Sequence, residues 1–143
     1  MNAPEILART LHAEAGSCAL RGIEALAALI IRRARMAMAC ELASTRFAHG
    51  AAPGSEAAMV VAVCQAPFQF GCWRRGGEAW DAAEDSQTLA MCRRVAIRAL
   101  AGTLPDLAPG ATHWHALHAL PAWAVGRMPV AETGGLALYR LAA

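Results

Sequence analysis

The chain has 143 residues, 57% of them hydrophobic, and is expected to form a single domain over residues 1–143. A net charge of +2, with no lysine and no run of basic residues, argues against nucleic acid as a partner. Five cysteines without a CxxC pair argue against a disulfide framework or a zinc ribbon.

The first predicted helix begins after Asn2, a residue type that caps helices, and it carries an inward-facing acid. Leu7, Leu11 and Glu14 recur at helical spacing and therefore share one face. An apolar surrounding desolvates a carboxylate and raises its pKa, as a general acid working near neutral pH requires. The alternative is that Glu14 lies at the frayed helix end and meets water. Glu14 is the candidate catalytic residue.

Two long helices are predicted on either side of a middle region dominated by loops. From Leu20 to Met38 apolar residues recur at helical spacing, and charged residues such as Glu24 are expected on the opposite, solvated face. The second long helix is predicted over residues 81–101 and ends before Gly102. Between them, a Gly/Pro loop is expected over residues 47–54 and a short β-branched run over residues 59–63. Cys40 and Cys92 are expected in the core.

Short strands are predicted near the C-terminus, over residues 114–120 and 136–141. A turn at Gly134–Gly135 precedes the second of them. On such a strand His113 and His115 would point to the same side.

Four blocks follow one another along the chain: LARTLHAEA at 7–15, QAPFQFGCW at 65–73, GATHWH at 110–115, and PAWA at 121–124 with LYR at 138–140. Over residues 6 to 140 they resemble the SleB-type cell-wall hydrolases, the family of spore cortex-lytic enzymes and related bacterial proteins. The chain departs from the family pattern where a second glutamate is replaced by Cys18, a histidine by Leu136 and a threonine by Ala108. These replacements remove polar groups that support the candidate acid.

The resemblance implies an α+β, lysozyme-like domain in which helices pack beside a small antiparallel sheet next to a substrate cleft. It further implies a cell-wall glycosidase that cleaves peptidoglycan glycan strands at the MurNAc–GlcNAc β-1,4 bond. With Glu14 as the single acid/base, lytic transglycosylation to a 1,6-anhydro product is favoured. An N-acetylmuramidase would need a second carboxylate, for which Asp106, Glu84 and Asp85 are the candidates.

Sugar rings present apolar faces and hydroxyl groups, which aromatic and polar side chains can bind. Trp73 is expected to be exposed because Arg74 and Arg75 flank it, and Tyr139 is expected either to orient Glu14 or to cap the core. The candidate substrate-binding residues are Gln69, Phe70, Trp73, His113, Trp114, His115 and Tyr139.

Two alternatives stay open. His113, His115 and His118 are spaced closely enough for a zinc site, although no nearby acid completes a zinc-hydrolase motif, and neither a metal nor another cofactor is predicted. The chain could also be a peptidoglycan-binding or regulatory module that keeps the fold without turnover, since a fold can survive the loss of its chemistry.

The expected place of action is the cell wall or periplasm. The N-terminus lacks the basic region of a signal peptide, and the longest apolar stretch, residues 25–31, is far short of the ~20 residues that span a bilayer. No membrane insertion is therefore predicted. Delivery to the wall would require a holin, as for phage-type endolysins, or secretion machinery.

Overall fold

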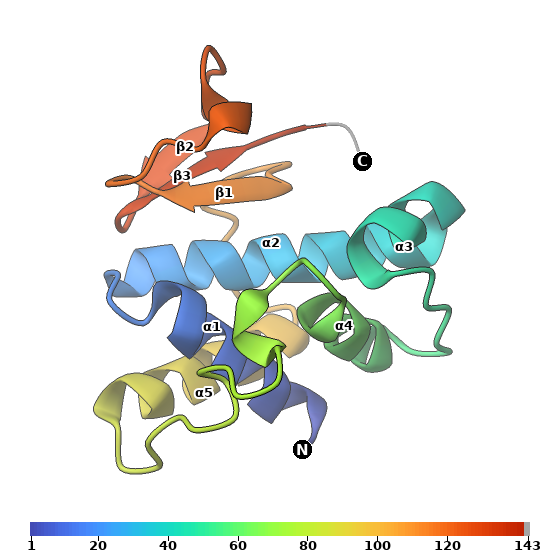
Figure 1. Cartoon of the computed structure of the whole chain (residues 1–143), viewed down its shortest axis with the longest axis vertical. Helices are drawn as coiled ribbons and strands as arrows, with labels where there is room; N and C mark the ends of the chain where they lie inside the picture. The colour runs from blue at the N-terminus through green and yellow to red at the C-terminus, as the bar shows by residue number, and fades with distance from the viewer. Residues whose placement is uncertain (142–143) are drawn as a thin grey trace.

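The computed structural model describes residues 1–141, which form helices followed by a small sheet (Figure 1). The elements are α1 (Ala3–Ala15), α2 (Leu20–Ala39), α3 (Glu41–Ala48), α4 (Glu56–Gln65), η1 (Gly71–Trp73), α5 (Gln87–Leu100), β1 (His113–Ala116), η2 (Ala122–Ala124), β2 (Ala131–Thr133) and β3 (Leu136–Tyr139). The α+β class is confirmed.

Helix α1 forms as its sequence predicts. The side chain of Asn2 accepts a hydrogen bond from the backbone N–H of Glu5 at 3.0 Å, which satisfies one of the free donors at the helix start. Leu7 and Leu11 are fully buried. The face that they share with Glu14 is therefore the face that packs against the rest of the protein.

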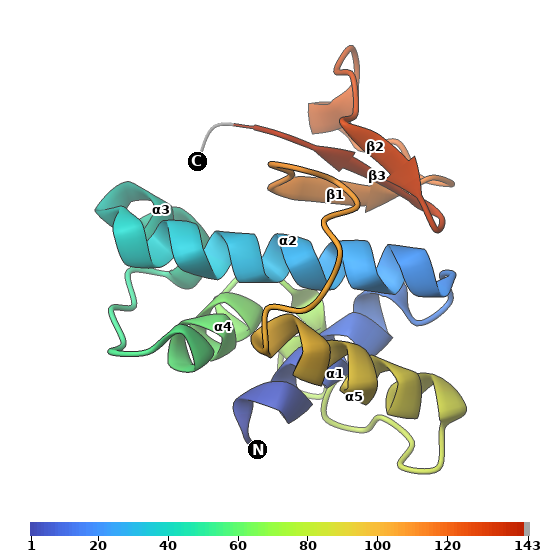
Figure 2. The same cartoon turned by 180° about the vertical axis from the view of Figure 1, so that it is seen from behind.

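Helix α2 separates the two layers of the molecule. The sheet lies along one side of it, and α1, α4 and α5 lie along the other (Figures 1 and 2). Ile23, Ala27 and Ile30 are fully buried as predicted. Glu24 was expected in solvent but is only 7% exposed, because α5 covers it and Arg98 forms an ion pair with it at 3.2 Å.

The sheet is antiparallel with strand order β1-β3-β2. Every residue of the central strand β3 is buried, and Leu136 and Leu138 belong to the main core. The predicted Gly134–Gly135 turn connects β2 to β3. Gly134 has a φ of +59°, and a Cβ there would lie 2.0 Å from the backbone nitrogen of Gly22, so only glycine allows the turn to approach α2 this closely.

Several local predictions in the middle of the chain were wrong. Phe47 and Ala48 end helix α3 instead of opening a loop, and residues 59–63 lie inside helix α4. Helix α5 begins at Gln87 and not at residue 81, because the side chain of Ser86 caps it by accepting from the backbone N–H of Leu89 at 3.2 Å.

The predicted strand boundaries also needed correction, since β1 ends at Ala116 and β3 at Tyr139. Cys92 is buried as expected, whereas Cys40 is exposed between α2 and α3. Within residues 1–141, none of the helices has the length and apolar character needed to cross a bilayer.

Candidate functional site

Glu14 lies in the last turn of α1 and is partly buried, against η1. Burial raises the pKa of its carboxyl above the ordinary value of 4.5. A hydrogen bond with the Cys72 thiol opposes this effect, and the negative charge of Glu78 reinforces it. The Glu14 carboxyl is therefore shifted toward the protonated form, in the direction that the sequence predicts for a general acid.

Cys72 is well suited to donate a hydrogen bond to the Glu14 carboxylate. Its thiol is buried in η1, and burial raises its pKa to about 12, with the charge of Glu14 adding to the effect. The thiol therefore keeps its proton near neutral pH and remains a donor. The Cys64 thiol, also buried, has a pKa raised to about 12 by burial and is hydrogen-bonded to Thr10.

Trp73 fixes η1 against α1. It is only 8% exposed, and its indole N–H donates to the Thr10 hydroxyl at 2.8 Å. The ring of Trp80 packs edge-on against the ring of Trp73, with 5.2 Å between the ring centres. The Trp80 indole N–H donates to the Trp73 carbonyl at 3.2 Å. The expectation of an exposed Trp73 was wrong, since the apolar ring turns into the core although two arginines follow it in the chain. Its hydrogen bond to Thr10 holds η1, the element that also contains Cys72, against α1.

A cavity of about 570 Å³ lies beside this end of α1. Its lining includes Ala13, the chain neighbour of Glu14, and Glu78, the acid whose charge acts on Glu14. The lining residues are His12, Ala13, Arg74, Gly76, Gly77, Glu78, Asp81, Ala82 and Ala83. Glu78 was missed by the sequence analysis, because nothing in its local pattern indicates that its loop packs against the end of α1.

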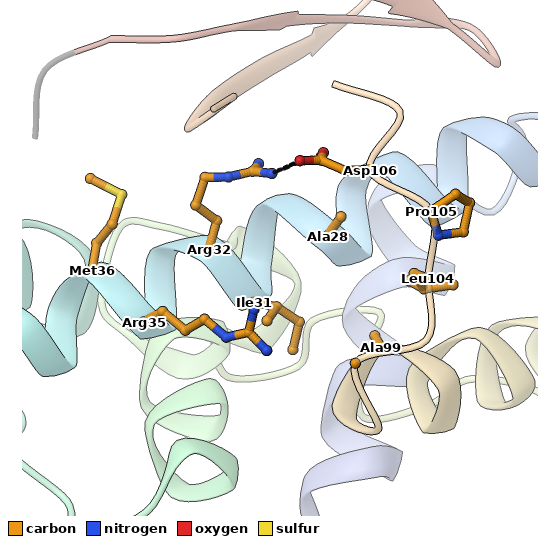
Figure 3. A pocket seen from close by; sticks show the side chains of 10 residues that line it. Ala28, Ile31, Arg32, Arg35, Met36, Ala99, Leu104, Pro105 and Asp106 are labelled. Atoms are coloured by element: carbon orange, nitrogen blue, oxygen red, sulfur yellow. Dashed lines mark hydrogen bonds and ion pairs between the residues drawn. The ribbon is translucent and has the colours of Figure 1, made fainter. Parts of the chain in front are cut away.

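The carboxylates that the sequence offered as second acids have other positions. Asp106 forms an ion pair with Arg32 at 2.9 Å, at the edge of a separate cavity of about 390 Å³ between α2 and the end of α5 (Figure 3). Glu84 accepts hydrogen bonds from Arg9 and Arg93, each at 2.9 Å. Asp85 is exposed. The carboxylate whose negative charge acts on Glu14 is instead Glu78.

Arg33 of α2 joins two of the four sequence blocks. Its Nε donates to the carbonyl of Thr112 at 2.8 Å, and its Nη1 donates to the Gln69 side chain at 3.3 Å. The guanidinium also lies 4.7 Å from the ring centre of Phe47 and 5.9 Å from that of Phe70. Arg33 was missed as well, although its position three residues after the buried Ile30 places it on the apolar face of α2.

The side chains of Gln69 and Phe70 contact mainly other groups of the protein. The Gln69 amide also donates to the carbonyl of Arg46 at 2.9 Å, so both ends of this side-chain amide are engaged with protein groups. Phe70 is buried in the main core and does not present a ring face to solvent.

The four rings of His113, His115, Trp123 and Tyr139 form an aromatic cluster on the sheet. The ring centres of His113 and His115 each lie 5.8 Å from the ring centre of Trp123. This confirms that both histidines point to one side of β1. Nε2 of His115 is 2.8 Å from the Tyr139 hydroxyl. Tyr139 is buried, and the partner of its hydroxyl is His115, where the sequence offered either Glu14 or a place capping the core. Burial, reinforced by nearby arginines, lowers the pKa of His113 to about 4.

Trp114 and the histidines are surrounded mainly by protein groups of the sheet and the core. Trp114 lies on β1 between the two histidines, is partly buried, and packs against the main core. Both ring nitrogens of His115 have protein partners, since Nδ1 lies 2.8 Å from the carbonyl of Ala116. His118 is exposed beyond the end of β1. Over residues 1–141, no three His, Cys, Asp or Glu side chains form a group that could hold a metal ion.

The four sequence blocks thus meet through a chain of contacts that crosses the molecule. Glu14 and Thr10 contact the 65–73 block through Cys72 and Trp73. Arg33 links that block to the 110–115 block, whose histidines contact Trp123 and Tyr139 in the last block. No protein-family model, curated protein or solved structure matches this chain.

Proposed function

We propose that this protein cleaves the glycan strands of peptidoglycan at the β-1,4 bond between MurNAc and GlcNAc, with Glu14 as the general acid. The observation that carries this proposal is the partly buried Glu14 carboxyl, whose pKa is raised by burial beside a cavity that its neighbours line. The resemblance of all four blocks to SleB-type cell-wall hydrolases names the substrate. The protein would act at the cell wall or in the periplasm.

Cleavage of a glycosidic bond requires a proton on the leaving oxygen as positive charge develops at C1 of the sugar. In the proposed reaction Glu14 donates this proton and becomes a carboxylate, which the Cys72 thiol stabilises by its hydrogen bond. The carboxylate then takes the proton of the muramic acid C6 hydroxyl while that oxygen bonds to C1. The products are a 1,6-anhydro-MurNAc end and a free GlcNAc hydroxyl, and Glu14 is protonated again.

The proposed fold is lysozyme-like, and the cavity beside Glu78 is the proposed place for sugar next to Glu14. Phe70 and Trp73 are not proposed to bind sugar, because their rings are buried. His113, Trp114 and His115 remain in it, since each is partly exposed on β1. Peptidoglycan is thus the proposed partner of both the α1 end and the sheet.

A muramidase is the second candidate, and Glu78 is the observation that favours it. Glu78 is exposed, lines the cavity and acts electrostatically on Glu14. A second carboxylate on the far side of the sugar could activate water or form a glycosyl-enzyme intermediate, and either route gives a reducing end.

A non-catalytic peptidoglycan-binding module is the third candidate function. It is motivated by the family residues that Cys18 and Leu136 replace.

The test is mass spectrometry of purified peptidoglycan after digestion by wild type, by Glu14→Gln and by Glu41→Gln, a control at an exposed acid of α3. We expect anhydro-muropeptides from wild type and from the control, with at least about a 100-fold loss in Glu14→Gln, because general acid catalysis contributes that much or more. All three proteins should have matching circular dichroism spectra.

Other products would redirect the assignment. Reducing-end fragments from wild type, lost in Glu78→Gln, would establish the muramidase and contradict transglycosylation. The absence of any glycan product from folded wild type, combined with its co-sedimentation with peptidoglycan, would contradict cleavage and leave the binding module.

A further inference from the structure

The segment that connects β1 to β2 exposes an unusual number of large apolar side chains. Six of them stand in solvent: Leu117 (50%), Leu120 (66%), Trp123 (38%), Val125 (64%), Met128 (87%) and Val130 (45%). We call these six residues the apolar tip. Single exposed apolar residues are ordinary, but six of them within residues 117–130 are a concentration that indicates an interaction surface.

The segment that carries the apolar tip projects away from the body of the protein. In Figures 1 and 2 the segment between β1 and β2 rises from the sheet on the side opposite to α2 and the other helices. Its base is anchored, because the buried Ala124 of η2 packs with Ala137 and Tyr139 of β3. The exposure of its apolar side chains therefore belongs to a turn that is fixed to the sheet.

Arg127 is the one charged side chain among residues 117–130, which contain no acid, and the exposed Glu132 follows on β2. Nε of Arg127 donates to the carbonyl of Trp123 at 2.8 Å, so this exposed cation is held against the same turn as the apolar side chains. An exposed group of Leu, Trp, Val and Met beside a cation fits a partner that is apolar inside and anionic at its surface.

We propose that the apolar tip docks on the surface of an anionic lipid bilayer, with Leu120, Val125 and Met128 entering the interfacial region and Arg127 contacting lipid phosphate. A tryptophan such as Trp123 is well placed in such an interface, because its ring is apolar and its N–H is polar. Since the turn is anchored beforehand, little ordering is needed on binding. A second copy of this chain suits the tip less well, because its own residues 117–130 offer no acid to Arg127, whereas a bilayer surface offers lipid phosphate.

The test is flotation of the full chain with vesicles of phosphatidylglycerol and phosphatidylcholine in equal amounts, and with vesicles of phosphatidylcholine alone. We expect binding to the anionic vesicles that weakens as salt is raised. Replacing Leu120, Val125 and Met128 together by serine should lower this binding at least about tenfold, because the apolar contact is lost. Arg127→Gln should weaken binding to the anionic vesicles and should not change any binding to the vesicles of phosphatidylcholine alone.

A matched control replaces three exposed apolar residues on the helices, Met38, Leu42 and Ile97, by serine. This control should bind as wild type does, and all variants should keep the wild-type melting temperature within a few degrees. The proposal is overturned if folded wild type does not bind anionic vesicles, or if the tip variant binds them as well as the control does. A dimer in light scattering that the tip variant abolishes would assign the tip to a second copy instead. None of these readouts depends on glycan cleavage.

Discussion

Glu5 and Glu14 lie on the same helix and have opposite electrostatic environments. Near the start of α1, Glu5 accepts hydrogen bonds from Arg93 at 2.7 Å and from Arg9 at 2.9 Å, and these arginines hold the pKa of its carboxyl down to about 2. In the last turn of α1, burial raises the pKa of Glu14. A carboxylate paired with arginines thus stabilises the fold, whereas a desolvated carboxylate is suited to proton transfer.

The two ends of α1 are also mechanically connected. Besides Glu5, Arg9 donates to the carbonyls of Ala79 and Trp80 at 3.1 and 3.2 Å, and to Glu84 at 2.9 Å. These bonds tie the segment after Glu78 to α1, and that segment forms part of the wall of the cavity. The ion pairs at one end of the helix therefore help to hold the cavity at the other end.

The largest effect on stability is expected for Arg9→Met. The methionine keeps the apolar stem, but the change leaves the Ala79 and Trp80 carbonyls without their donor and leaves Glu5 with Arg93 as its partner. Losing one partner of a buried charged network costs about 3 kcal/mol. Urea denaturation measures this loss. Arg35→Met, which breaks an exposed pair with Glu56, should cost less than about 1 kcal/mol. Equal losses in the two variants would show that the Arg9 network adds no more than a surface pair.

A smaller effect is expected for Glu5→Gln, and it should depend on pH. Because the folded pKa of about 2 lies below the ordinary value of 4.5, the stabilisation from Glu5 is complete above pH 4.5 and is lost as pH falls toward 2. After allowance for solvent screening, the variant should lose about 1–2 kcal/mol at pH 7. The difference from wild type should decrease between pH 5 and pH 3 and vanish below pH 2, and denaturation curves at pH 3, 5 and 7 would show the decrease. A pH-independent difference would contradict the ion-pair assignment.

The smallest effect, of opposite sign, is expected for Glu14→Gln. The raised pKa of Glu14 means that its contribution to stability is most favourable below pH 4.5 and falls as pH rises through the folded pKa. The variant should therefore be more stable than wild type by about 0.5–1 kcal/mol at pH 7, because the neutral amide avoids the desolvation of a buried charge. At pH 4 the gain should shrink. The titration of His113 affects both proteins equally and cancels in the difference. A marked loss of melting temperature would instead make Glu14 a structural residue.

The sequence predicted the parts of the site that depend on local patterns. The cap at Asn2 and the spacing of Leu7, Leu11 and Glu14 act within a few helical turns, so they placed Glu14 correctly on the packed face of α1. The alternation along β1 likewise placed His113 and His115 on one side. Trp73 was misplaced, because its exposure depends on the partner that Thr10 of another element offers it and not on its charged chain neighbours.

Local patterns in the sequence predicted the core faces of α1 and α2, short strands near the C-terminus, the glycine turn before β3 and the place of Glu14 on the packed face of α1, because periodicity, capping and turn chemistry are local properties. The tertiary structure was needed to show that the charge of Glu78 acts on Glu14, that Arg33 joins Gln69 to Thr112, and that residues 59–63 belong to a helix. Burial and charge environment depend on which distant segment packs opposite a residue, and no local pattern contains that information.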